Sequence, residues 1–214
     1  LPDPEVRMAA LCVLGRLRRP ASLSILSQAV YDPHPAVRAF AAGALGEFGS
    51  TDGIAPLTHA LSDENPRVRS VAASSLGRLG ATETRSVVQP LLRDPDEHVR
   101  ISAVEALLRL GDASAVLNAA DLARHPDPSV RGGAAHALAA ATTPNALTVL
   151  ESLLRDQQPL PRLMAARALG KLQQKSLISP LKTGLQDSDP TVRIASAGSL
   201  IHILSRKDKQ GSAR

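Results

Sequence analysis

The apolar positions of this chain recur every 31 residues, and within each period they follow the spacing of an amphipathic helix. Each period contains an arginine, preceded by valine in six copies and by proline in one, and followed seven residues later by leucine. The valine and the leucine fall on one stripe of a 3.6-residue helix. The leucines are Leu14, Leu45, Leu76, Leu107, Leu138, Leu169 and Leu200. A fixed period of this kind predicts a stack of similar helical units.

Capping residues predict where these helices begin and end. Most copies carry Asp or Asn before the helix and proline at its first position, which are favoured at helix N-termini. We expect helices to start near residues 4, 35, 66, 97, 128, 159 and 190, with Gly49, Gly80 and Gly111 as left-handed C-terminal stops. A shorter second helix is expected in each repeat, for example over 53–62 and 84–93. The connections are short, so neighbouring helices are expected to run antiparallel.

These patterns predict an all-α fold, an alpha-alpha superhelix of paired antiparallel helices with a 31-residue repeat. Thin layers rich in Ala and Leu need few rings, which agrees with an aromatic content of 1%. The expected organisation is a single solenoid domain over residues 3–205, followed by a basic, flexible tail at 206–214. Glycines eight residues after the repeated arginine (Gly15, Gly46, Gly77 and Gly170) cost helix propensity, so they predict close helix-to-helix approach.

The repeat pattern also resembles a known family. The pattern D-x-P-x-V-R-x-x-A-A-x-A-L-G-x-L-G, as in DENPRVRSVAASSLGRLG at 63–80, resembles HEAT repeats of the phycobilisome-lyase type, which are armadillo-like helical solenoids. The resemblance covers residues 3–205. It implies that the Val-Arg helix is the second of each pair and lines the concave side. One leading second helix at about 4–18 would precede six complete pairs, which indicates a fragment of a longer protein.

The resemblance further implies that Asp and Arg side chains form a ladder between neighbouring repeats. The alternative is a row of guanidinium groups that binds phosphates or carboxylates. A residue that recurs in every layer serves what every layer needs, so the structural interpretation is favoured, although each exposed rung contributes little to stability. The ladder residues are Asp32, Arg38, Asp63, Arg69, Asp94, Arg100, Arg131, Asp156, Arg162, Asp187 and Arg193.

The net charge of +5 raises nucleic-acid binding as a hypothesis. The seven repeated arginines and their five aspartates contribute +2, and residues 206–214 contribute the other +3. The remaining basic and acidic residues balance, so the sequence holds no dedicated basic stripe. One Tyr, two Phe and no Trp leave little for base stacking. The sequence therefore disfavours a nucleic-acid partner, which stays an alternative.

No catalytic motif or metal-ligand spacing occurs, so we expect no enzymatic activity, no cofactor and no metal site. His98 and His136 lie on predicted concave columns, where a metal-binding or pH-sensing role competes with that of ordinary surface histidines. The single cysteine, Cys12, cannot form an internal disulfide, which favours a cytoplasmic location. No apolar stretch approaches the roughly 20 residues of a membrane span.

Specific function is expected where the repeats differ. Variable positions on the Val-Arg helices predict a concave face with an apolar floor and a basic edge, unless the apolar side chains are buried between layers. The predicted partner-binding residues are Met8, Arg16, Phe40, Arg67, Val71, Arg78, Ile101, Arg109, Leu163, Met164, Lys171 and Ile194. This face predicts a non-catalytic protein-interaction scaffold for a peptide or partner protein. The alternatives are a phycobilin lyase-like subunit or chaperone that binds a bilin, which the resemblance suggests, and a nucleic-acid-binding HEAT protein.

Overall fold

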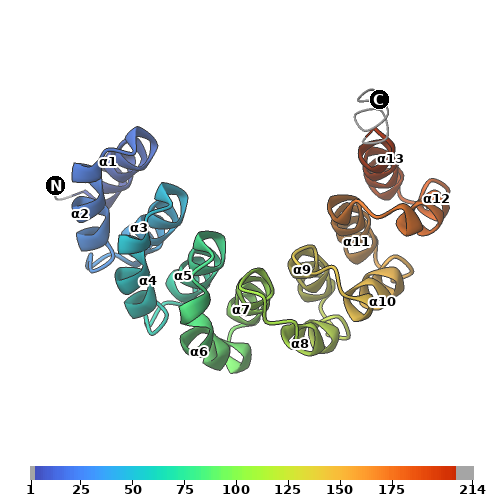
Figure 1. Cartoon of the computed structure of the whole chain (residues 1–214), viewed down its shortest axis with the longest axis horizontal. Helices are drawn as coiled ribbons and strands as arrows, with labels where there is room; N and C mark the ends of the chain where they lie inside the picture. The colour runs from blue at the N-terminus through green and yellow to red at the C-terminus, as the bar shows by residue number, and fades with distance from the viewer. Residues whose placement is uncertain (1–2, 206–214) are drawn as a thin grey trace, which may run out of the picture. The chain divides into compact units, whose positions relative to one another are not determined.

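The computed structural model describes residues 3–205, which form thirteen α-helices and four short 3-10 helices, with no β-strand among them. The predicted all-α solenoid of helical repeats is confirmed (Figure 1). The chain divides into two compact units, unit 1 (Leu1–Asp112) and unit 2 (Ala113–Arg214), which are described separately. The expectation of a single domain over 3–205 stays a prediction, and the tail predicted at 206–214 lies outside the described residues.

Unit 1 contains two layers of helices. Its longer helices carry the Val-Arg pairs and pack in sequence, α1 on α3, α3 on α5 and α5 on α7, while the shorter helices cover one side of that row (Figure 1). The α-helices are α1 (Pro4–Leu17), α2 (Pro20–Ala29), α3 (Pro35–Phe48), α4 (Ile54–Ala60), α5 (Pro66–Leu79), α6 (Arg85–Val88) and α7 (Glu97–Arg109). The 3-10 helices are η1 (Thr51–Gly53), η2 (Thr82–Thr84) and η3 (Gln89–Arg93).

Unit 2 repeats this arrangement. Its longer helices α9, α11 and α13 pack on one another in that order, and α8, α10 and α12 pack against them. The bounds are α8 (Ala115–Leu122), α9 (Pro128–Leu138), α10 (Pro144–Leu153), α11 (Pro159–Leu172), η4 (Lys175–Leu177), α12 (Ile178–Gly184) and α13 (Pro190–Leu204). The helices α1, α3, α5, α7, α9, α11 and α13 are called the Val-Arg helices below, although α11 carries Pro161 in place of the valine.

The Val-Arg helices begin where the capping residues predict, at residues 4, 35, 66, 97, 128, 159 and 190. Five of the preceding residues accept hydrogen bonds from the first turn of their helix, namely Asp3, Asn65, Asp96, Asp127 and Asp189. Gly49, Gly80 and Gly111 adopt positive φ, as expected of C-terminal stops. Arg18 and Gln173 occupy the same repeat position and also adopt positive φ, of 45° and 55°.

The shorter helices depart from their predicted bounds. In the segment expected as a helix over 53–62, Gly53 is the last residue of η1, and α4 runs from Ile54 to Ala60. The prediction of one helix over 84–93 is wrong, because α6 ends at Val88 and η3 continues from Gln89 to Arg93. Pro90 explains this break, since it has no N–H to donate to the carbonyl four residues earlier.

The predicted apolar stripe forms the core of each unit. Leu45, Leu76 and Leu107 are fully buried in unit 1, as are Leu138 and Leu169 in unit 2. The glycines of the stripe lie at close helix contacts, as expected. A Cβ on Gly77 would lie 2.7 Å from the Cα of Ala106, and one on Gly46 would lie 2.6 Å from the Cβ of Ser75. Neighbouring Val-Arg helices therefore pack with little space between their backbones.

Candidate functional site

The repeated arginines donate hydrogen bonds to carboxylate and backbone carbonyl oxygens of the same chain. Arg69 donates from Nε and Nη2 to the two carboxylate oxygens of Asp94, both at 2.8 Å. Its Nη1 donates to the carbonyl oxygens of Asp63 at 2.8 Å and Glu64 at 3.0 Å, in the loop before α5. Asp94 also accepts from the backbone N–H of Asp96. Arg69 therefore links its own preceding loop to the loop before the next Val-Arg helix.

Five pairs share this bidentate geometry among the described residues. They are Arg7–Asp32, Arg38–Asp63 and Arg69–Asp94 in unit 1, and Arg131–Asp156 and Arg162–Asp187 in unit 2. The side chains of these pairs are largely buried. The hydrogen bond from Arg69 lowers the pKa of Asp94, and Arg131, Arg162 and Arg7 act in the same way on their aspartates. These carboxylates are held ionised by their partners.

Two arginines assigned to the ladder have different partners. Arg100 donates to the carbonyl oxygens of Asp94 and Pro95, and its Nη2 lies 3.2 Å from the carboxylate of Glu97. The residue 25 positions on, where the repeat elsewhere provides aspartate, is His125. Arg193 donates to the carbonyl oxygens of Asp187 and Ser188. The carbonyl contacts are thus the part of the pattern that recurs even where the aspartate does not.

A pocket on the Val-Arg helices of unit 1 brings together five of the predicted partner-binding residues. It has a volume of about 510 Å³ and lies over α1, α3 and α5. Its lining residues are Met8, Leu11, Cys12, Gly15, Arg16, Ala36, Ala39, Phe40, Gly43, Ala44, Glu47, Arg67 and Val71. It is called the unit 1 pocket below.

Small side chains between larger ones shape the unit 1 pocket. Gly43 and three alanines of α3 line it with small side chains, and Val71 of α5 lies 3.6 Å from where a Cβ on Gly43 would stand. Met8 and Val71 are half-buried, and Phe40 keeps 37% of its surface exposed. These side chains are thus partly accessible. The alternative interpretation required them to be buried between layers.

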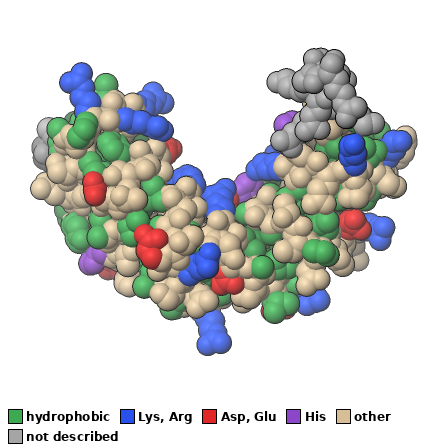
Figure 2. All heavy atoms as spheres, viewed as in Figure 1, with side chains coloured by type: hydrophobic (Ala, Val, Ile, Leu, Met, Phe, Trp, Pro, Cys, Tyr) green, Lys and Arg blue, Asp and Glu red, His purple; other side chains and the backbone are tan. Residues whose placement is uncertain are grey.

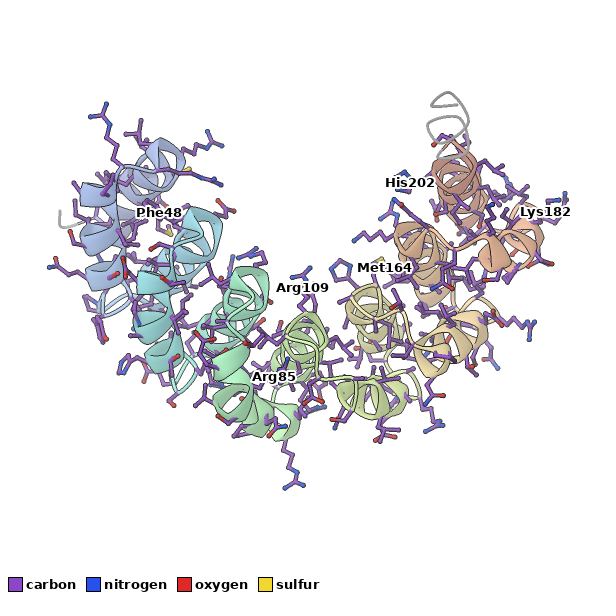
Figure 3. All side chains as sticks on the ribbon, in the orientation of Figure 1. Phe48, Arg85, Arg109, Met164, Lys182 and His202 are labelled. Atoms are coloured by element: carbon purple, nitrogen blue, oxygen red, sulfur yellow. The ribbon has the colours of Figure 1, made fainter. Side chains whose placement is uncertain are left out.

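The other predicted residues of unit 1 do not line this pocket. Arg78 donates to the hydroxyl of Ser75 at 2.9 Å, and Arg109 pairs with Glu105 on its own helix at 2.7 Å. Ile101 is half-buried on α7. Figure 3 labels Arg109 on α7, and it labels Arg85 of the shorter-helix layer between α6 and α7, where its guanidinium donates to the carbonyl oxygen of Leu110.

Unit 2 carries two smaller hollows on its Val-Arg helices. One, of about 320 Å³, is lined by His136, Ala139, Met164, Arg167, Ala168 and Lys171. The other, of about 340 Å³, is lined by Arg167, Gly170, Lys171, Ala195, Gly198, Ser199 and His202. Figure 3 shows Met164 and His202 on one side of the unit and Lys182 on the other. Figure 2 shows basic and histidine side chains along the margin of unit 2 that carries the Val-Arg helices.

The predicted set captured this surface only in part. Met164 and Lys171 line the hollows, Leu163 is half-buried on α11, and Ile194 is 72% exposed on α13 outside both linings. Arg167 and His202 were missed. The sequence does contain a signal for them, because both lie in variable columns of the repeat. Arg167 is five residues after the repeated arginine of its helix, and His202 is nine residues after that of its own.

Two further features of the described residues bear on other functions. No group of three or more His, Cys, Asp or Glu side chains within 3–205 is arranged to hold a metal ion. None of the helices described is both long enough and apolar enough to cross a membrane.

Comparisons with known proteins point to one family. A family model for HEAT repeats matches residues 1–75, 54–119, 86–162 and 152–211, which together span nearly the whole chain. A comparison with curated proteins finds no match.

Solved structures of helical repeat proteins are similar to this chain. The complex of CpcE and CpcF of phycocyanin lyase from Nostoc sp. PCC7120 has a TM-score of 0.70 at 21% identity, covering 98% of this chain and 90% of that chain. An engineered protein has a TM-score of 0.54 at 22% identity, covering 86% and 96%. A designed armadillo repeat protein has a TM-score of 0.50 at 19% identity, covering 85% and 99%. At identities this low, likeness shows the fold alone.

Proposed function

Because the chain belongs to the HEAT-repeat family, we propose that it is a non-catalytic interaction scaffold that binds a peptide or partner protein through its Val-Arg helices. The observation that carries this proposal is the unit 1 pocket. Three successive repeats contribute Met8, Phe40 and Val71 to this pocket. All three residues are apolar and occupy variable positions of the repeat. Constant positions fill the core, so apolar residues at variable positions are available for recognition.

The size and the lining of the pocket suit an apolar side chain of a partner. Binding pockets of about 300–1,000 Å³ with apolar walls and a few polar groups are typical of ligand sites, and this pocket measures about 510 Å³. Methionine adapts its shape to different ligands because it is unbranched and flexible. We infer that one or two apolar residues of the partner enter between Met8 and Phe40.

The charges at the rim of the pocket indicate what flanks these apolar residues. Arg16 and Arg67 both line the pocket and are exposed, and neither forms an ion pair with another described residue. The single carboxylate in the lining is that of Glu47. A partner segment with an acidic residue beside its apolar anchor complements this arrangement.

A peptide-display selection against the whole chain tests the proposal. Selected peptides should share an apolar anchor next to an acidic residue. Phe40→Asp places a charge in the pocket wall, so it should weaken binding of the selected peptides by at least about tenfold, as truncation of an interface anchor does. Affinity is measured by fluorescence anisotropy with labelled peptide.

The matched control is Val87→Asp. Val87 lies on α6 in the other helix layer and is 42% exposed, so this variant adds the same charge outside the pocket and should bind with unchanged affinity. Both variants are compared by circular dichroism to establish equal helix content. The proposal would be contradicted if the folded Phe40→Asp variant bound the selected peptides as tightly as the unmodified chain does. It would also be contradicted if the chain bound a bilin or an oligonucleotide that the selected peptides do not displace.

A further inference from the structure

The Val-Arg helices of unit 2 have a charge composition of their own. The sequences of α9, α11 and α13 contain no aspartate or glutamate. The aspartates closest in sequence precede these helices, where Asp127 and Asp189 cap them and Asp156 and Asp187 pair with Arg131 and Arg162. In unit 1, by contrast, α1, α3 and α7 each carry at least one glutamate. The Val-Arg helices of unit 2 therefore carry no negatively charged side chain.

Four basic or titratable side chains gather on these helices. His136, Arg167, Lys171 and His202 line the two hollows of unit 2, and Arg167 and Lys171 belong to both linings. All four side chains are exposed, and His202 lies within hydrogen-bonding distance of the side-chain amide of Gln173. No carboxylate takes part in either lining. The group is called the unit 2 basic cluster below.

The floor under the cluster allows close approach of a ligand. Gly170, Ala195 and Gly198 line the second hollow together with Arg167 and Lys171, and a Cβ added to Gly198 would meet no atom within 4 Å. A backbone can therefore lie close to α11 and α13, with its side chains directed at the cations.

We propose that the unit 2 basic cluster binds an extended acidic peptide segment, whose carboxylates enter the two hollows one after the other. The two hollows share α11 and lie on successive helix pairs, α9 with α11 and α11 with α13. Neighbouring helices pack about 8–10 Å apart, and a peptide in the extended polyproline II conformation advances about 3.1 Å per residue with three residues per turn. Carboxylates three residues apart in sequence therefore lie on one face of such a peptide, about 9 Å apart, and match the spacing of the hollows.

The observations favour a peptide over a nucleic acid. The three aromatic residues of the chain, Tyr31, Phe40 and Phe48, all belong to unit 1. Unit 2 therefore has no Phe, Tyr or Trp on which a base could stack, and stacking on such rings is a main source of affinity for single strands. This proposal shares with the proposed function only the premise that the Val-Arg helices face a partner. It does not depend on the unit 1 pocket.

The test uses the whole chain and a fluorescein-labelled peptide of Gly and Ser with aspartate at every third position, followed by fluorescence anisotropy at low ionic strength. A second peptide has the same composition with its aspartates adjacent. The spaced peptide should bind more tightly than the clustered one. Arg167→Glu combined with Lys171→Glu should weaken its binding at least about tenfold, because like charges then face each other. The same double variant should gain affinity for a peptide with lysines in place of the aspartates.

The matched control is Lys175→Glu combined with Lys182→Glu. It changes the net charge by the same amount, and both lysines are exposed in η4 and α12, outside the hollows. This control should retain binding of the spaced peptide, and so should Phe40→Asp, which separates the outcome from that of the proposed function. Three outcomes would overturn the proposal. They are a loss of peptide binding in the control as large as in the double variant, equal affinity of the chain for both aspartate peptides, and displacement of the spaced peptide by a short oligothymidine.

Discussion

At the scale of single residues, Ser196 breaks the pattern of its column. The other six repeats have alanine three residues after the arginine, whereas α13 has serine there. The side chain is fully buried, and its hydroxyl has no hydrogen-bond partner. It points at Gly184 of α12, where a Cβ would lie only 3.0 Å from the Cβ of Ser196. A buried hydroxyl without a partner loses its hydration and gains nothing in return.

We therefore expect Ser196→Ala to stabilise the protein. The substitution restores the residue of the other repeats and removes the buried hydroxyl, so the free energy of unfolding should rise by about 1 kcal/mol. Urea unfolding followed by circular dichroism measures the change.

A second serine on the same helix provides the control. Ser199 is also buried, but its hydroxyl donates to the carbonyl oxygen of Ala166 at 2.9 Å. Ser199→Ala should lower the free energy of unfolding by about 1 kcal/mol, because a buried hydrogen bond is lost. If both variants changed stability in the same direction, the contrast between the two hydroxyls would be refuted.

Residue-level prediction from the sequence worked where the cause is local. The capping aspartates and Asn65 were identified correctly, because a cap depends on its own side chain and the next two or three backbone N–H groups. Arg18 and Gln173 were not predicted to adopt positive φ. Their conformation follows from the path of the chain into the next helix, which the repeat imposes although L side chains disfavour it.

At the scale of elements, close contacts between Val-Arg helices depend on glycine. Gly77 on α5 faces Ala106 on α7, and an added Cβ would lie 2.7 Å from the backbone Cα and 3.1 Å from the Cβ of Ala106. Backbone cannot move aside as a flexible side chain can, so the two helices would have to separate. Gly198 on α13 differs, since nothing lies within 4 Å of an added Cβ.

Replacing each of these two glycines by alanine should change stability in opposite directions. Gly77→Ala should destabilise the protein by about 1–3 kcal/mol, the cost of overpacking a contact. Gly198→Ala should stabilise it by about 0.5–1 kcal/mol, because alanine favours helix without meeting a neighbour. Thermal and urea unfolding of both variants provide the comparison. A neutral Gly77→Ala would show that α5 and α7 can separate freely.

The elements that the sequence predicted less well are those that depend on several segments at once. The break at Pro90 and the bounds of α4 reflect how the shorter helices fit against the longer ones. The sequence places Met8, Phe40 and Val71 in neighbouring columns of the predicted partner-binding face, and the structure adds that they line one pocket. Arg78 and Arg109 both occupy the column nine residues after the repeated arginine, yet they pair locally with Ser75 and Glu105, and only side-chain geometry reveals these partners. The unit 2 basic cluster joins two columns that meet once α11 packs between α9 and α13.

At the scale of the whole molecule, the aspartate–arginine pairs couple folding to pH. Three such pairs lie in unit 1 and two in unit 2, within the residues described. The arginine lowers the pKa of Asp32, Asp94, Asp156 and Asp187. At Asp63 burial raises the pKa, but the hydrogen bonds from Arg38 and the backbone together outweigh it, so the pKa is lowered there too. The stabilisation is therefore present in full above the unfolded pKa of about 3.9 and is lost as the pH falls through the folded values.

Asp94→Asn tests this linkage. The substitution removes the charge that Arg69 contacts, and hydrogen bonds to charged groups contribute about 1.5–3 kcal/mol, so the variant should be less stable by that order at neutral pH. Its deficit relative to the unmodified chain should shrink as the pH falls from about 4 toward 2, because the aspartate of the unmodified chain then becomes protonated. Urea unfolding at a series of pH values measures both quantities.

The control is another aspartate paired with an arginine. Asp121 lies 3.4 Å from Arg124 on the surface, with both side chains more than three-quarters exposed. Solvent screens such a pair, so Asp121→Asn should change stability by less than about 0.5 kcal/mol at neutral pH. If Asp94→Asn kept a constant deficit at every pH, the loss would come from packing rather than from charge. The repeated pair would then hold the layers together through shape and hydrogen-bond geometry alone, and acid would unfold the chain for another reason.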